Sequence, residues 1–166
     1  GVGDSVVHGP TAGRRLTKQE FIYSVEDLFG AEVALPANRL EGESGSQLRF
    51  RNDLLEVSVS DQRVSAYESL AEEIAAAVPS AKLVSFASCA ETMAACQNSF
   101  VQELGRHLYR RPLSETETEN LTRLFAVSGE QPQAFEAGAR LVLRAMLQSP
   151  FFLYKVEKQQ PVPDAY

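Results

Sequence analysis

The sequence predicts an all-α protein, in which about five helices form a compact bundle with a long loop after the first helix. Apolar residues recur in several stretches at the spacing of one helix face. Two stretches begin with a capping box, a hydroxyl residue followed three positions later by glutamate, and glycine or proline ends most of them. The 166 residues, 44% of them hydrophobic, are enough to bury one core.

The first helix is predicted to begin after Thr17, where "TKQE" forms a capping box. Its apolar stripe consists of Phe21, Val25, Leu28 and Phe29, and Gly30 ends it. Residues 1–13 before it are rich in glycine and have no helical period, which indicates a flexible arm or linker.

The long loop is expected from residues 31–53, which lack periodicity and contain a proline and two glycines. Apolar and polar residues then alternate, which leaves open a minor strand near 55–59. A segment of this length forms no sheet alone.

Four further helices follow from the same signals. They are expected from Ser60 or Asp61 to Pro79, from Met93 or Ala94 to before Pro112, from the capping box "SETE" at 114–117, and from Pro132 to Ser149. In the last one, Arg140 and Arg144 are expected to face outward.

The helical domain would cover residues 14–157, either undivided or as sub-parts 14–80 and 88–157. Residues 158–166 are read as a tail leading to a missing or separate C-terminal partner domain.

The charge and the apolar runs exclude two classes of partner. The net charge of -6 and the pI near 5.0 oppose nucleic-acid binding, because phosphate contacts need a concentrated basic face. No apolar run reaches the roughly 18 residues of a membrane span.

Cys89 and Cys96 have a spacing that fits neither a C-x-x-C redox or zinc site nor the C-x-x-C-H of haem attachment. In one continuous helix their α-carbons would lie about 10 Å apart, beyond the roughly 7 Å that a disulfide tolerates. A disulfide therefore requires Cys89 to lie in a non-helical lead-in that folds back, and it would imply an oxidising compartment. Two buried free thiols are the alternative.

The stretch "HLYRRPLSETE" at 107–117 holds the candidate binding residues His107, Arg110 and Arg111. They lie near the end of the third helix, and glutamates begin the next one. The economical interpretation is an intramolecular clamp between arginine and carboxylate across the joint between the helices. Binding of an external anion or of a partner's carboxylate is the alternative.

No catalytic constellation is visible in this chain. A nucleophile elbow G-x-S-x-G, a phosphate-binding glycine pattern and a Cys/His metal pattern are all missing from the sequence. The aromatic segment "SPFFLYKVE" offers a different candidate, because Phe151, Phe152 and Tyr154 could cover a partner domain.

Three segments in fixed order carry a resemblance: "GRRLTKQEFIYSVEDLFG", "ELGRHLYRRPLSETE" and "GARLVLRAMLQSPFFLYKVE". Together they resemble the N-terminal portion of large secreted proteins of planctomycetes and myxobacteria. In those proteins, helical domains of unknown function are commonly fused to, or encoded with, cytochrome c domains.

The resemblance implies an exported protein, periplasmic or extracellular, and it supports the disulfide because many relatives have a similar cysteine pair. It implies a partner, either the C-terminal remainder of the same protein or a second chain, with a c-type cytochrome domain as a candidate. Haem would then lie elsewhere in the full protein, since this chain lacks C-x-x-C-H and no cofactor is assigned to it.

Two functions remain. The first is a non-catalytic scaffold or docking module of a larger secreted, cytochrome-linked protein for redox chemistry or polymer breakdown. The second is half of an active site that a following domain completes, with His107, Arg110 and Arg111 binding an anionic group.

Overall fold

The computed structural model of the chain describes residues 13–31, 33, 61–88, 93–128 and 134–156. Within them the protein is helical, apart from one small two-stranded sheet, and the predicted all-α class is confirmed. The predicted arm before Gly13, the strand near 55–59, the tail and most of the long loop lie outside the described residues. These predictions and the domain limits therefore stay predictions.

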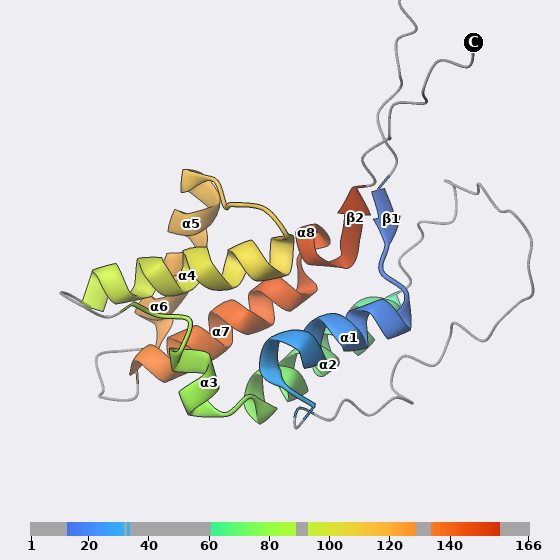
Figure 1. Cartoon of the computed structure of the whole chain (residues 1–166), viewed down its shortest axis with the longest axis horizontal. Coiled ribbons are helices and arrows are strands. Elements are labelled where there is room, and N and C mark those ends of the chain that lie inside the picture. The colour runs from blue at the N-terminus through green and yellow to red at the C-terminus, as the bar shows by residue number, and fades with distance from the viewer. Residues whose placement is uncertain (1–12, 32, 34–60, 89–92, 129–133, 157–166) are drawn as a thin grey trace, which may run out of the picture.

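The elements follow one another along the chain as shown in Figure 1. They are β1 (Gly13–Arg15), α1 (Lys18–Phe29), α2 (Asp61–Ala77), α3 (Ser80–Val84), α4 (Met93–Tyr109), α5 (Glu115–Thr122), α6 (Leu124–Val127), α7 (Ala134–Gln148), α8 (Pro150–Leu153) and β2 (Tyr154–Val156). The helices with eight residues or more are α1, α2, α4, α5 and α7, which agrees with the expected bundle.

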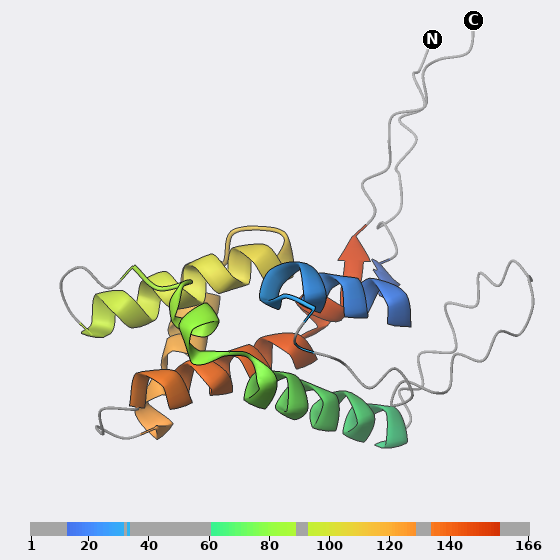
Figure 2. The same cartoon turned by 60° about the horizontal axis from the view of Figure 1, so that its bottom comes forward.

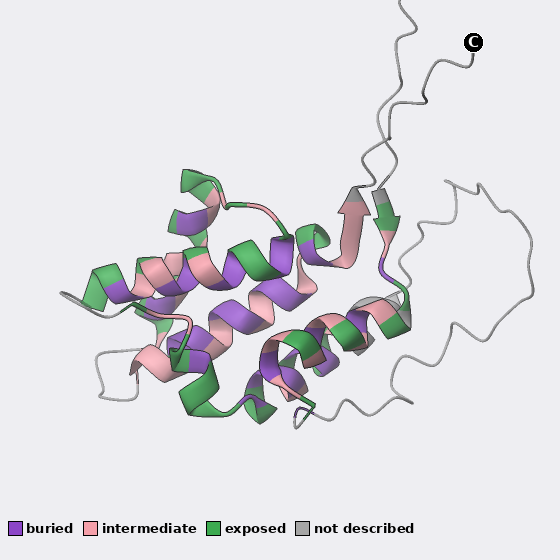
Figure 3. Cartoon of the chain, viewed as in Figure 1, coloured by how far each residue is buried: buried purple, intermediate pink, exposed green. Residues whose placement is uncertain are grey.

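Helix α7 is the centre of the bundle. It contacts α2, α3, α4, α5, α6 and α8, and Figure 2 shows α4 running alongside it. Its buried side includes Ala139, Val142, Leu143, Met146 and Leu147. Figure 3 shows buried residues along both α4 and α7. Gly138 of α7 packs closely against α6, since an added Cβ would lie only 2.9 Å from Cγ of Phe125.

Helix α1 begins and packs as its sequence predicts. Thr17 accepts from the amide of Glu20 at 3.2 Å, and Glu20 accepts from the amide of Thr17 at 2.9 Å, which completes the capping box. The ring of Phe21 meets Tyr67 of α2 at 5.9 Å and Phe152 of α8 at 5.3 Å. These contacts join the start of the described chain to its middle and its end.

Strands β1 and β2 form an antiparallel pair that sequence analysis did not predict. Gly13 lies opposite Val156, Arg14 opposite Lys155, and Arg15 opposite Tyr154. The amide of Leu16 continues the pairing by donating to the carbonyl of Leu153 at 2.7 Å. We call this pair the strand clasp. It brings the two ends of the described chain side by side (Figure 1).

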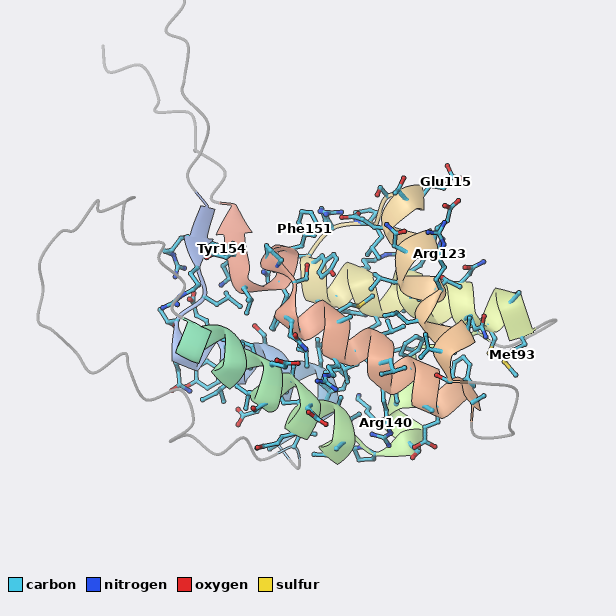
Figure 4. All side chains as sticks on the ribbon, turned by 180° about the vertical axis from the view of Figure 1, so that it is seen from behind. Met93, Glu115, Arg123, Arg140, Phe151 and Tyr154 are labelled. Atoms are coloured by element: carbon cyan, nitrogen blue, oxygen red, sulfur yellow. The ribbon has the colours of Figure 1, made fainter. Side chains whose placement is uncertain are left out.

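The outward orientation predicted for Arg140 is wrong. Arg140 lies across the C-terminal end of α2, where it donates to the carbonyl oxygens of Ala75 and of Val78, the latter at 3.0 Å, and it pairs with Glu136 at 2.8 Å (Figure 4). The last carbonyls of a helix have no partner within the helix, and a cation satisfies them well. One turn later, Arg144 pairs with the exposed Glu68 and Glu72 at 3.2 and 3.5 Å.

Two further elements differ from expectation. Residues 80–84 were expected in a connector but form α3, a short helix that buries Leu83 completely. The single helix expected after "SETE" is interrupted at Arg123, so that α5 and α6 are separate. Within the described part of the chain, no helix combines the length and the apolar character needed to cross a bilayer.

Candidate functional site: the joint between α4 and α5

The joint begins at Arg110, directly after the last residue of α4. Its φ of 58° is the only positive φ outside glycine among the described residues. This left-handed conformation turns the chain out of the helix, and it costs a non-glycine residue about 1 to 2 kcal/mol. The native contacts of the Arg110 side chain must therefore offset this cost.

The guanidinium of Arg110 reaches α8. Its Nη2 donates to the carbonyl oxygen of Phe152 at 2.8 Å, and its Cζ lies 5.8 Å from the centre of the Phe152 ring. Burial lowers the pKa of Arg110, and the nearby carboxylate of Glu20 opposes that shift. Arg110 thus ties the end of α4 to the turn before β2.

Arg111 forms the clamp that the sequence predicts. Its Nη1 and Nη2 donate to the two carboxylate oxygens of Glu117 at 2.8 and 2.6 Å, which confirms an intramolecular ion pair across the joint. Glu117 also accepts from the amide of Ser114 at 2.8 Å, while the Ser114 hydroxyl accepts from the amide of Glu117 at 3.2 Å. The hydrogen bonds from Arg111 are the main cause that lowers the pKa of Glu117 to about 2.

An aromatic pair lies against the same arginine. The Cζ of Arg111 is 4.5 Å from the ring centre of Phe151 and 5.7 Å from that of Tyr109, and the two rings are 5.5 Å apart. These distances fit cation–π and aromatic contacts. Burial raises the pKa of Tyr109. The Phe151 ring is therefore held in place although 51% of the residue is exposed.

The three residues of the predicted aromatic docking surface have different environments (Figure 4 labels Phe151 and Tyr154). Phe151 is exposed and Tyr154 is half-buried. Phe152 is completely buried against Phe21, so its assignment to a surface is wrong. Because α8 is a single turn, adjacent residues point to different sides, and a run of apolar letters does not show which one enters the core.

His107 has contacts of its own. Its Nε2 lies 3.2 Å from a carboxylate oxygen of Glu103, one turn earlier on α4, and its ring meets Phe86 edge-on at 5.9 Å. The predicted cluster of His107 with Arg110 and Arg111 therefore consists of three side chains with three different sets of partners. An anion-binding role for them stays a prediction.

A second charged cluster lies at the strand clasp, and sequence analysis missed it. Arg14 donates to both carboxylate oxygens of Glu20 at 2.8 and 2.9 Å, and Lys155 donates to one of them at 3.0 Å. These bonds, with that of Arg14 the strongest, hold the pKa of Glu20 well below its usual range. The only signal in the sequence was Glu20 itself, since its partner Lys155 is 135 residues away.

The described residues contain no group of three or more histidine, cysteine or acidic side chains that could hold a metal ion. Cys96 is buried on α4 with 5% of its surface exposed. Cys89 lies outside the described residues, and the predicted pairing of the two cysteines stays a prediction.

Two family models match the chain. Residues 14–79 match the family PSD3, "Protein of unknown function (DUF1587)", and residues 96–157 match PSD5, "Protein of unknown function (DUF1595)". The first match spans β1, α1 and α2, and the second begins within α4 and includes the α4–α5 joint, α7 and α8. No curated protein and no solved structure matches the chain.

Proposed function

We propose that this chain is a helical docking module of a larger exported protein that also carries a c-type cytochrome domain. The observation that carries the proposal is the exposed ring of Phe151, which lies against Tyr109 and Arg111. An aromatic side chain that is already ordered loses little conformational entropy on binding, and aromatic residues are enriched in protein interfaces. Phe151 is fixed by Tyr109 and Arg111 but retains half of its surface for a partner.

A disulfide between Cys89 and Cys96 belongs to the same proposal, because it would be stable only in an oxidising compartment such as the periplasm or the exterior. The resemblance of the three segments supports it, because many relatives have a similar cysteine pair. The test is thiol counting on the denatured, unreduced protein. Two reactive thiols in protein exported to the periplasm would contradict the disulfide and remove the support that it gives to natural export.

The link to a cytochrome rests on the ordered resemblance of three segments, and it has a direct test. The reading frame that encodes this chain, or one next to it, should encode a C-x-x-C-H motif. The purified full protein, or its complex, should show the Soret absorbance of haem. A parent protein with neither feature would overturn the cytochrome link.

The second candidate is an active site shared with a following domain, and the backbone of Arg110 favours it. Non-glycine residues with positive φ cluster at functional sites, where strain helps to position a side chain. This hypothesis predicts that Arg111→Ala abolishes an activity of the full protein and leaves its melting temperature nearly unchanged. The clamp with Glu117 predicts a loss of stability of about 1 kcal/mol or less and no specific effect on activity.

A further inference from the structure

We propose that the two segments matched by different families, residues 14–79 and 96–157, are the halves of one folding unit, and that each half is the specific binding partner of the other. We call them the PSD3 half and the PSD5 half. A chain that carries only one half would then have to recruit the other half from a second chain. The proposal is independent of the docking role of Phe151, because it concerns the buried face between the halves.

The first support is a core that both halves build. The buried apolar residues of the described chain form one cluster, to which the PSD3 half contributes Val25 and Ile74 and the PSD5 half contributes Phe100, Leu143 and Met146. Helix α2 packs more extensively against α7 of the PSD5 half than against α1 of its own half. A domain that folds alone has a hydrophobic core of its own. Because this core is shared, each half needs the other to bury its apolar face.

One pair of aromatic side chains crosses the boundary directly. The ring centres of Phe21 in the PSD3 half and Phe152 in the PSD5 half are 5.3 Å apart, and the two residues are 2% and 0% exposed. Neither ring keeps this contact when the halves are apart. The cost of removing one of them therefore reports on the contact between the halves.

The C-terminal end of α2 is closed by a residue of the other half. Arg140 donates to the carbonyl oxygens of Ala75 and of Val78, the latter at 3.0 Å (Figure 4). The last carbonyls of a helix have no partner within the helix. A PSD3 half on its own lacks this cation, so the end of its helix α2 would be less stable.

The strand clasp also joins the halves. Strand β1 lies at the start of the PSD3 half and β2 at the end of the PSD5 half, with Arg14 opposite Lys155. The amide of Leu16 then donates to the carbonyl of Leu153 at 2.7 Å. A single strand of three residues forms no sheet. The clasp therefore exists only while the halves are together.

The length of each half supports the same conclusion. A chain of about 60 residues buries only about 60% of the surface that it exposes when unfolded, and its stability is marginal. Residues 14–79 and residues 96–157 are both close to this length. We therefore expect each half to lose most of its structure when it is separated from the other.

The experiment uses the full chain with a protease recognition site inserted within residues 89–92, between the halves. A reductant is present, so that no disulfide between Cys89 and Cys96 holds the cleaved pieces together. In sedimentation, the cleaved pieces should remain associated with the mass of the uncut chain. After separation in urea and removal of the urea, each piece alone should lose most of its helical circular dichroism, and mixing the two should restore it. Titration of one piece with the other gives the dissociation constant.

Two variants and two matched controls locate the contact. Phe21→Ala should weaken association at least about tenfold, whereas Tyr23→Ala, which removes an exposed aromatic side chain from the same helix, should leave it unchanged. Arg140→Gln should weaken association by about tenfold. Its control is Arg123→Gln, which removes an exposed arginine that binds Glu119 and Asn120 of its own half.

A second measurement needs no inserted site. In native-state hydrogen exchange of the unmodified chain, the slowest amides of α2 and of α7 should open with the same free energy and the same dependence on urea. This agreement is expected of one cooperative unit, whereas two independent domains would have different values.

Four outcomes would overturn the proposal. A separated piece keeps its helical signal and unfolds cooperatively, the separated pieces do not recombine although the uncut chain refolds, or Phe21→Ala has no more effect than Tyr23→Ala. The fourth is that the slowest amides of α2 open with a lower free energy and a weaker urea dependence than those of α7. Each would mean that the two segments are separate domains that only lie in contact.

Discussion

At the scale of single residues, two adjacent arginines have separate tasks. Arg110 adopts a left-handed backbone conformation and donates a hydrogen bond to the carbonyl of Phe152. Arg111 pairs with Glu117 and lies against the ring of Phe151. The sequence predicted the second task, since Ser114 and Glu117 identify the start of the next helix. The first was not predictable, because glycine or asparagine is expected at a left-handed position and the acceptor is a backbone atom 42 residues away.

The strained backbone gives a prediction for Arg110. Arg110→Ala should lower the free energy of unfolding by about 2 kcal/mol, because it removes the hydrogen bond to Phe152 and keeps the strain. Arg110→Gly loses the same bond but relieves the strain, so it should be more stable than the alanine variant by about 1 kcal/mol. Urea denaturation measures both. An alanine variant more stable than the glycine variant, as in an ordinary helix interior, would contradict this account.

The pair of Arg111 and Glu117 should make stability depend on pH. Glu117→Gln should cost about 1 kcal/mol at neutral pH. The folded pKa of Glu117, about 2, lies below its ordinary 4.5, so the stabilisation is present above 4.5 and is lost as pH falls toward 2. The difference between wild type and variant should therefore shrink across this interval in urea titrations. Glu115→Gln, in the same helical turn, is the control and should show a smaller, nearly constant difference.

At the scale of elements, the ends of helices determine how the bundle is assembled. The capping boxes at Thr17 and Ser114 are local, and they formed where the sequence placed them. The end of α2 is closed instead by Arg140, a residue of α7 more than sixty positions later. Helical periodicity predicts which residues face the core, but it does not reveal a cation that bends over a neighbouring helix. The outward orientation expected for Arg140 was wrong for this reason.

The two arginines of α7 provide a comparison between a helix cap and an exposed ion pair. Arg140→Gln should lower the free energy of unfolding by about 2 kcal/mol, because it removes a charged donor from the carbonyls that end α2. Arg144→Gln should cost less than about 1 kcal/mol, since its partners Glu68 and Glu72 are exposed. Thermal unfolding of both variants shows whether the loss of stability is larger for Arg140→Gln than for Arg144→Gln. Equal losses would show that Arg140 is only another surface ion pair.

At the scale of the whole molecule, the strand clasp is the feature that sequence analysis could not supply. Each of its strands has three residues, too few for an alternating pattern, and the partners are separated by most of the chain. The helical class, the main helices and the clamp of Arg111 depend on local signals and were predicted. The clasp, the cluster around Glu20 and the buried position of Phe152 depend on contacts distant in sequence, and no pattern within a short window encodes them.

The clasp should open in acid. The pKa of Glu20 is lowered in the folded protein, chiefly by Arg14, so its contribution to stability is complete above the ordinary pKa of 4.5 and declines as pH falls from there toward the lower folded pKa. Hydrogen exchange at the amide of Leu16, which donates to Leu153, should accelerate at low pH relative to amides of α4, after correction for the intrinsic rate. Glu20→Gln should give the faster exchange already at neutral pH. An unchanged exchange rate of the Leu16 amide in that variant would show that Glu20 does not stabilise the clasp.

The clasp also decides how this protein would respond to tension. A pull that separates the segments before Gly13 and after Val156 loads the outermost pair of strands first, and then each pair in turn, as in a zipper. Apart from α1, whose Glu20 binds Arg14 and Lys155 of the two strands, the helices lie outside the path of the force until the last pair, Leu16 with Leu153, has parted. Pulled by its two ends, the molecule would lengthen at the clasp before most of the helical bundle bears load.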